Sequence, residues 1–121
     1  MQIFGHAWIE SQDFYSISSV EEINTTPSNS LLQLEPLEKS LALAKYCQKN
    51  GLQYVLEVST IEGAIFANVL GATYILSNKA LAKELMPIAQ SYLFDTRILA
   101  EINSSEIEEM AKCGVDGVFI K

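Results

Sequence analysis

One stretch near the C-terminus shows the unit from which most of this chain is built. It begins with the apolar run Thr96-Arg-Ile-Leu-Ala-Glu-Ile102 and continues through Asn103-Ser-Ser-Glu-Ile-Glu-Glu-Met-Ala-Lys-Cys113. Gly114 then separates this segment from a second apolar run, 115–120. Short apolar runs are typical of buried strands. The middle segment starts with a helix-capping pattern and ends before a glycine, as helices often do. The stretch therefore predicts a strand, a helix and a second strand.

The same unit recurs along the chain from residue 31 onward. Apolar runs with strand character begin near residues 31, 52, 72, 96 and 115, and a helical segment separates each from the next. Strands that alternate with helices at this spacing predict right-handed crossovers and a parallel sheet. We expect an α/β fold of about five parallel βα units, curled as half of a β/α barrel or flat as a three-layer sandwich.

The first thirty residues have a different pattern. Residues 2–9 and 14–17 alternate loosely between apolar and polar side chains, and Glu10-Ser-Gln-Asp13 between them has turn composition. This pattern predicts an N-terminal β ribbon. A chain of 121 residues is the size of one domain. We expect that single domain to span residues 1–121, with the ribbon and a loop in 1–30 and the βα units in 31–121.

Composition excludes several classes of partner. The net charge of −7 argues against nucleic acid, because that binding depends on clustered Lys and Arg. No apolar run approaches the roughly 20 residues of a membrane helix. The start of the sequence lacks the basic and apolar regions of a signal peptide, so we expect a cytoplasmic protein with Cys47 and Cys113 reduced.

Polar side chains recur where the expected strands end. The residues at the C-terminal ends of the five successive strands are Glu35, Glu57, Ser77, Glu101 and Lys121. In open α/β sheets and in β/α barrels this edge carries the ligand site. Glu57, Glu101 and Lys121 are therefore our candidate catalytic residues, since paired carboxylates suit proton transfer.

A second group of residues is expected to bind a ligand at the same edge. Helix N-termini near Asn78 and Asn103 offer free N–H groups to an anion, and Arg97 offers a positive charge. The candidate ligand-binding residues are Glu35, Ser77, Asn78, Arg97 and Asn103. The alternative is a structural network in which Arg97 and Lys121 neutralise the glutamates, so we expect a basic partner close to Glu57 and Glu101. No metal or cofactor motif is present, and His6 is the single imidazole.

Residues 53–121 resemble part of a (β/α)8 barrel, and are most similar to class I aldolases that cleave 2-keto-3-deoxy-6-phosphogluconate. The similar segments are Leu56-Glu57-Val58-Ser59, Leu70-Gly71-Ala72-Thr73-Tyr74-Ile75-Leu76-Ser77 and residues 105–114. The resemblance implies an acid/base role for Glu57. It places the family's Schiff-base lysine at Phe119, so that residue does not carry over, and Lys121 lies two positions further along.

Two functions are consistent with these patterns. The first is a small non-catalytic or regulatory domain that binds an anionic metabolite or a partner at the C-terminal ends of its strands. The alternative is a small lyase or isomerase of β/α-barrel ancestry that acts on a keto acid or sugar phosphate. Because five βα units cannot close into a barrel, we also expect an exposed sheet edge at residues 115–120. A homodimer with this strand at or near its interface, or the N-terminal ribbon, would cover it.

Overall fold

The computed structural model describes residues 1–28 and 30–121 of the chain. Within these residues, seven parallel strands form one sheet in the order β1-β7-β6-β5-β4-β3-β2. The strands are β1 (Gln2–Phe4), β2 (Phe14–Ser16), β3 (Leu31–Leu34), β4 (Tyr54–Glu57), β5 (Tyr74–Asn78), β6 (Arg97–Ile102) and β7 (Gly117–Ile120). The helices are α1 (Val20–Ile23), α2 (Leu37–Lys49), α3 (Ile61–Val69), α4 (Lys79–Ser91), the 3-10 helix η1 (Ser104–Glu106) and α5 (Ile107–Lys112).

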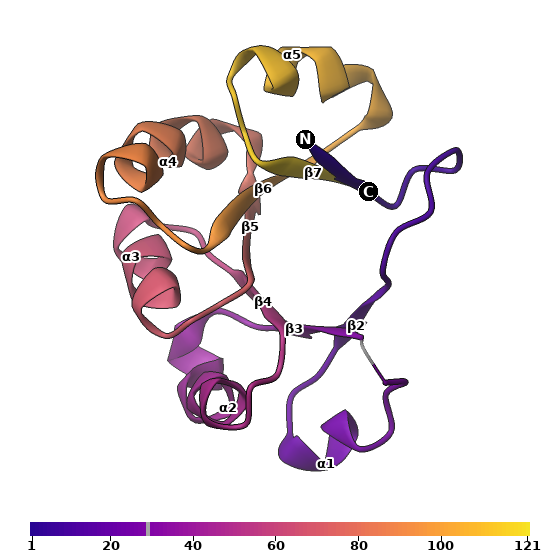
Figure 1. The fold of residues 1–121 in the computed structure, drawn as a ribbon, viewed down its shortest axis with the longest axis vertical. Coiled ribbons are helices and arrows are strands. Elements are labelled where there is room, and N and C mark those ends of the chain that lie inside the picture. Colours follow the sequence, from indigo (N-terminus) through magenta and orange to yellow (C-terminus); the bar gives the residue numbers. More distant parts are fainter. Residues whose placement is uncertain (29) are drawn as a thin grey trace.

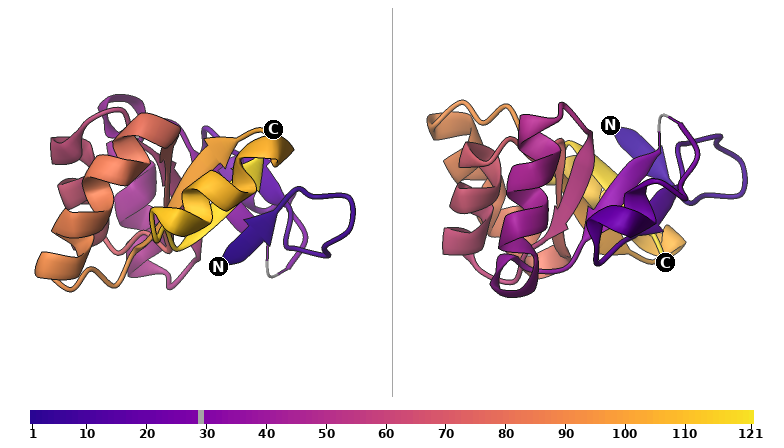
Figure 2. Two further views of the ribbon diagram at one scale, coloured as in Figure 1. Left: turned by 90° about the horizontal axis from the view of Figure 1, so that it is seen from above. Right: turned by 90° about the horizontal axis from the view of Figure 1, so that it is seen from below.

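The sheet curls around one axis, with α2 to α5 on its outer side (Figure 1). Its edge strands, β1 and β2, border the open side, and the segment 5–13 runs from one to the other. Seen from the side, that segment lies opposite the layer formed by α3 and α4 (Figure 2). The expected α/β fold with a parallel sheet is confirmed, and the sheet is a curled half-barrel, not a flat sandwich.

The central strands are buried on both faces. Between the sheet and the helices lie residues such as Tyr54, Leu56 and Ile75. The residues that alternate with them point to the inside of the curl, where they form a second apolar cluster: Phe4, Leu31, Val55, Tyr74, Leu76 and Leu99, with Phe14 and Phe119 packed against it. Strands covered on both faces read as nearly continuous apolar runs, which is the pattern seen in the sequence.

Local capping explains why the helices begin and end where they do. The Thr60 hydroxyl accepts a hydrogen bond from the Gly63 N–H (3.0 Å), and the Asn78 side chain accepts one from the Leu81 N–H (2.8 Å). Gly51, Gly71 and Gly114 follow three of the helices with positive φ angles, as expected for glycine stops.

The longest helices, α2 and α4, have 13 residues each. In the part of the chain that the structure describes, none is both long and apolar enough to cross a membrane.

The two N-terminal strands do not pair with each other as the expected ribbon. β1 pairs in parallel with β7, and β2 pairs in parallel with β3, so the two strands lie at opposite edges of the sheet. Their aromatic side chains meet inside the curl instead. The Phe4 and Phe14 rings lie 5.0 Å apart, and Phe14 stacks on Phe119 at 4.9 Å. Each strand therefore adds an aromatic ring to the inner cluster while it extends the sheet.

β7 is not an edge of the sheet. It lies between β6 and β1, with Gln2 opposite Gly117 and Phe4 opposite Phe119. Of the two expected ways to cover the edge at residues 115–120, the structure shows one: the N-terminal strand covers it. The homodimer itself remains a prediction, but it no longer has a reason to form at this strand.

Candidate functional site

Four of the candidate residues lie together at the C-terminal edge of the sheet. Glu57 ends β4 and Glu101 lies near the end of β6, while Glu35 and Lys121 directly follow β3 and β7. In the strand register, Glu57 lies opposite Leu76, and Glu101 lies opposite Asn78 on one side and Phe119 on the other. Leu76 and Phe119 belong to the inner cluster, so Glu57 and Glu101 are on the inner face of the curl.

Ser77 and Arg97 lie elsewhere. Ser77 is opposite Ala100, which belongs to the helix-facing core, and its buried hydroxyl donates to the Asn78 carbonyl (3.1 Å). The residues of β5 that point into the curl are Tyr74 and Leu76, so Ser77 does not share the inner face with Glu57 and Glu101. Arg97 is the first residue of β6. Measured along the strand, Arg97 lies about 13 Å from Glu101, at the N-terminal ends of the strands.

A polar hollow of about 220 Å³ opens at the C-terminal ends of β2, β3 and β4, beside α1. Its lining combines carboxylates, hydroxyls and one amide with two aliphatic side chains: Ser16, Ile17, Ser18, Glu22, Gln33, Leu34, Glu35 and Glu57. Three of these residues are glutamates from different elements. Two of them, Glu35 and Glu57, are strand-end residues, and Glu22 comes from α1.

Neutral donors hold two of these carboxylates. The Gln33 amide donates a hydrogen bond of 2.6 Å to Glu57 Oε1. The Ser18 hydroxyl donates one of 2.8 Å to Glu22 Oε1. None of the ion pairs formed by the described residues includes Glu22, Glu35, Glu57 or Glu101. The described residues therefore form no ion pair at Glu57 or Glu101: an amide holds Glu57, and Arg97 lies at the N-terminal ends of the strands.

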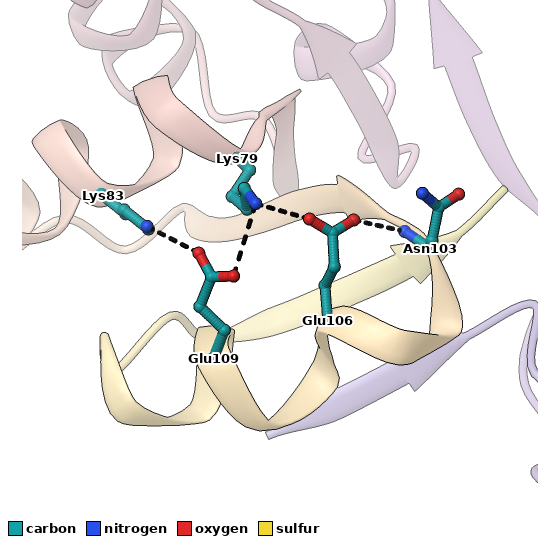
Figure 3. Close-up of polar contacts among 5 residues, drawn as sticks. All are labelled: Lys79, Lys83, Asn103, Glu106 and Glu109. Carbon is teal, nitrogen blue, oxygen red and sulfur yellow. Dashed lines mark hydrogen bonds and ion pairs between the residues drawn. The ribbon is translucent and has the colours of Figure 1, made fainter.

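Three of the four ion pairs of the described residues lie on the other side of the same edge, where they join α4 to η1 and α5 (Figure 3). Lys79 contacts Glu106 at 2.5 Å and Glu109 at 3.4 Å, and Lys83 contacts Glu109 at 2.7 Å. The bond and charge of Lys79 lower the pKa of Glu106, and the bond from Lys83 lowers the pKa of Glu109. The bond to Glu106 raises the pKa of Lys79. This network clamps two successive βα units together, and Lys79 is engaged within it.

The network also explains the position of Asn103. Its backbone N–H donates to Glu106 Oε1 (3.0 Å) as part of a capping box. The Asn78 side chain likewise caps α4. The sequence predicts N–H groups open to an anion at these two positions. In the structure, side-chain oxygens of the protein accept hydrogen bonds from N–H groups there. Both residues lie at the expected edge, and their observed contacts are structural.

Lys121 and Phe119 occupy different surroundings at the end of β7. Phe119, at the position that the resemblance assigns to the aldolase lysine, lies inside the curl and stacks on Phe14. Lys121 is exposed, its backbone N–H donates to the Ile102 carbonyl (3.1 Å), and its charge also lowers the pKa of Glu106. The positive charge of Lys121 therefore acts on the Glu106 carboxylate.

The remaining candidates for metal or thiol chemistry are separate from the hollow. His6 Nδ1 accepts a hydrogen bond from the Trp8 N–H (3.0 Å) within the segment 5–13. Cys47 and Cys113 are both free thiols, and burial raises the pKa of Cys47 to about 11. Among the described residues, no group of three or more His, Cys, Asp or Glu side chains is arranged to hold a metal ion.

Several residues of the hollow were not expected from the sequence. Ser16, Ser18 and Glu22 come from the N-terminal region, whose place in the sheet has no local signal in the sequence. Gln33 shares a strand face with Glu35, and that pattern could have identified it. Comparison with known proteins adds no family: no family model matches the chain, and no curated protein shows significant similarity. The fold agrees with the β/α-barrel part of the resemblance, and no matching family supports the aldolase part.

Proposed function

We propose that this chain is a small non-catalytic binding domain whose ligand occupies the hollow beside Glu57. One observation carries the proposal: three glutamates line a hollow at the ligand-binding edge of a parallel β/α sheet, and two of them, Glu22 and Glu57, accept hydrogen bonds from neutral donors.

The lining favours a particular ligand chemistry. Glu22, Glu35 and Glu57 present acceptors and negative charge, while Gln33 and the serines offer hydrogen bonds to a hydroxylated molecule. A small amine or polyol therefore suits the hollow better than the anionic metabolite expected from the sequence. An anion would depend on Lys121, because Arg97 lies at the opposite edge and Lys79 is engaged with Glu106.

Titration calorimetry with three probes tests this proposal: a diamine, a small polyol and inorganic phosphate. We expect the diamine or polyol to bind, and Glu57→Gln to weaken that binding roughly tenfold, the equivalent of about 1.4 kcal/mol. Glu84→Gln is the matched control, since Glu84 is an exposed carboxylate on α4. Binding of phosphate alone, lost in Lys121→Ala and kept in Glu57→Gln, would replace this proposal with the anionic ligand.

The alternative is a small lyase or isomerase in which Glu57 transfers a proton. The observation in its favour is the half-buried position of Glu57 at a strand end, where the Gln33 amide fixes its orientation. A positioned carboxylate of this kind is a requirement of general acid/base catalysis. Turnover of a keto acid or sugar phosphate that Glu57→Gln abolishes and Glu84→Gln preserves would establish the enzyme and contradict the binding domain.

A further inference from the structure

An apolar groove runs over the outer surface between α2 and α3. It has a volume of about 390 Å³, and Leu37 and Leu41 of α2 line one side while Phe66, Val69 and Leu70 line the other. Exposure here is high for such residues: 45% for Leu41, 51% for Phe66 and 68% for Val69. Contiguous exposed side chains of this size mark interaction surfaces in proteins that are otherwise well packed.

α3 has the composition of a helix that is covered on all sides. Its sequence, Ile61-Glu-Gly-Ala-Ile-Phe-Ala-Asn-Val69, contains one charged residue. Ala64 and Ala67 face the sheet, and Ile65, Phe66 and Val69 face outward. A surface helix normally places charged residues on its outer side, as α4 does with Lys83 and Glu84. The outer face of α3 is therefore built for contact with protein.

Charges on α2 indicate which protein fits this face. Glu38, Leu41 and Lys45 are exposed and follow each other at positions i, i+3 and i+7, so they form one line along the helix. Glu62 of α3 adds a second exposed carboxylate at the N-terminal end of the face, and Lys49 adds a second positive charge at its C-terminal end. The face is thus acidic at one end, apolar in the middle and basic at the other.

This layout is complementary to itself. A two-fold axis that passes through Leu41, perpendicular to α2, reverses the direction of the helix in the second copy. It places Leu41 against Leu41, and Glu38 of each copy against Lys45 of the other. A closed two-fold interface requires this type of self-complementarity, because the same patch serves both subunits. Opposite charges around an apolar centre also fix the orientation of the two copies.

We propose that a second copy of this chain covers the α2–α3 face and forms a two-fold dimer with antiparallel α2 helices. The partner is specified by the order of charges along α2, and the burial of Phe66 and Val69 supplies the apolar contact. The interface is separate from the β7 strand, and its groove adjoins the hollow at Glu57, which lines both.

Sedimentation equilibrium at micromolar concentrations tests the dimer. We expect a dimer for the wild-type chain and a monomer for Phe66→Glu, which places a charge in the centre of the face. Gln90→Glu introduces the same charge on the exposed surface of α4 and should leave the dimer intact. A wild-type monomer, or a dimer that Phe66→Glu does not affect, would overturn the proposal.

A charge-reversal series identifies the partner as a second copy in this orientation. Glu38→Lys alone sets two positive side chains against each other across the interface, and Lys45→Glu alone sets two carboxylates together. Each should raise the dissociation constant roughly tenfold, because like charges are unfavourable across an interface. The double variant restores opposite charges and should restore the wild-type constant. Both positions are exposed, so we expect each variant to fold, and circular dichroism checks this. A double variant that dimerises more weakly than either single variant would exclude the antiparallel arrangement.

Discussion

At the scale of single residues, Gly117 decides whether β1 can join the sheet. A Cβ atom at this position would lie 2.7 Å from Leu99 Cδ2 and 2.8 Å from the Gln2 carbonyl oxygen. Leu99 belongs to the inner cluster, and Gln2 is the residue of β1 that pairs with Gly117. The absence of a side chain therefore allows two things at once: dense packing inside the curl and close approach of the N-terminal strand.

We expect Gly117→Ala to reduce the free energy of unfolding by about 1–3 kcal/mol, because the added methyl group forces Leu99 or β1 to move. Urea denaturation measures this change. Gly51→Ala is the control: its Cβ would have no neighbour within 4 Å among the described residues, so it bears only the strain of φ +65°, about 1–2 kcal/mol. A Gly117→Ala chain as stable as the wild type would show that β1 does not occupy the observed position.

At the scale of elements, the Lys79 network holds α4 against η1 and α5. Glu106 and Glu109 have lowered pKa values, and Lys79 has a raised one, each chiefly through a hydrogen-bonded ion pair. The lowered carboxylate pKa values stabilise the folded state above the unfolded Glu pKa of about 4.3. That contribution is lost as the pH falls through the folded values. The raised Lys79 pKa contributes below the unfolded Lys pKa of about 10.4, and its contribution is lost as the pH rises through the folded value.

Lys79→Met should therefore lower the melting temperature at neutral pH, with a difference from the wild type that shrinks at acidic pH and again at strongly alkaline pH. Added salt should also reduce this difference, because the groups are partly exposed to solvent. Thermal melts over a pH series measure the effect. Lys39→Met removes an exposed lysine of α2 that takes no part in the ion pairs of the described residues, and it should show no such pH profile. A constant difference at all pH values would mean that packing of the Lys79 stem, not charge, matters.

At the scale of the whole molecule, aromatic side chains connect the two edges of the sheet. Phe4 of β1 contacts Phe14 of β2 and Tyr74 of β5, with ring centroids 5.0 Å and 5.4 Å apart. The edges themselves are not paired with each other among the described strands. The half-barrel is therefore held together across its open side by side chains inside the curl and by the segment 5–13 outside it.

A chain that starts at Ser28 lacks β1, β2 and α1, and it should expose the inner cluster to water. We expect this chain to bind a hydrophobic dye and to aggregate, since β7 and β3 would become unprotected edges. Light scattering and dye fluorescence measure both effects. Trp8→Ala, a change in the segment 5–13 at a side chain that is 88% exposed, should behave as the wild type. A truncated chain that is soluble and equally stable would contradict the role assigned to β1 and β2.

The sequence by itself determined the βα units from residue 31 onward, because their signals are local. Caps such as Thr60 and Asn78, and glycine stops such as Gly71, act within a few residues of the helices they bound. The C-terminal positions of Glu57 and Glu101 follow from the same strand boundaries. The curl of the sheet was one of two shapes consistent with these units, since both shapes bury the same apolar runs.

Only the tertiary structure decided how distant segments meet. β1 joins β7, more than a hundred residues away in the chain, through a backbone pairing that leaves no local pattern. The face of Ser77 depends on where the alternation of β5 begins, and a shift of one residue moves each side chain to the other face. Gln33 becomes the partner of Glu57 because β3 and β4 are neighbours, and Glu22 reaches the same hollow from α1. Local free energies select the elements, whereas burial of side chains from all of them selects their arrangement.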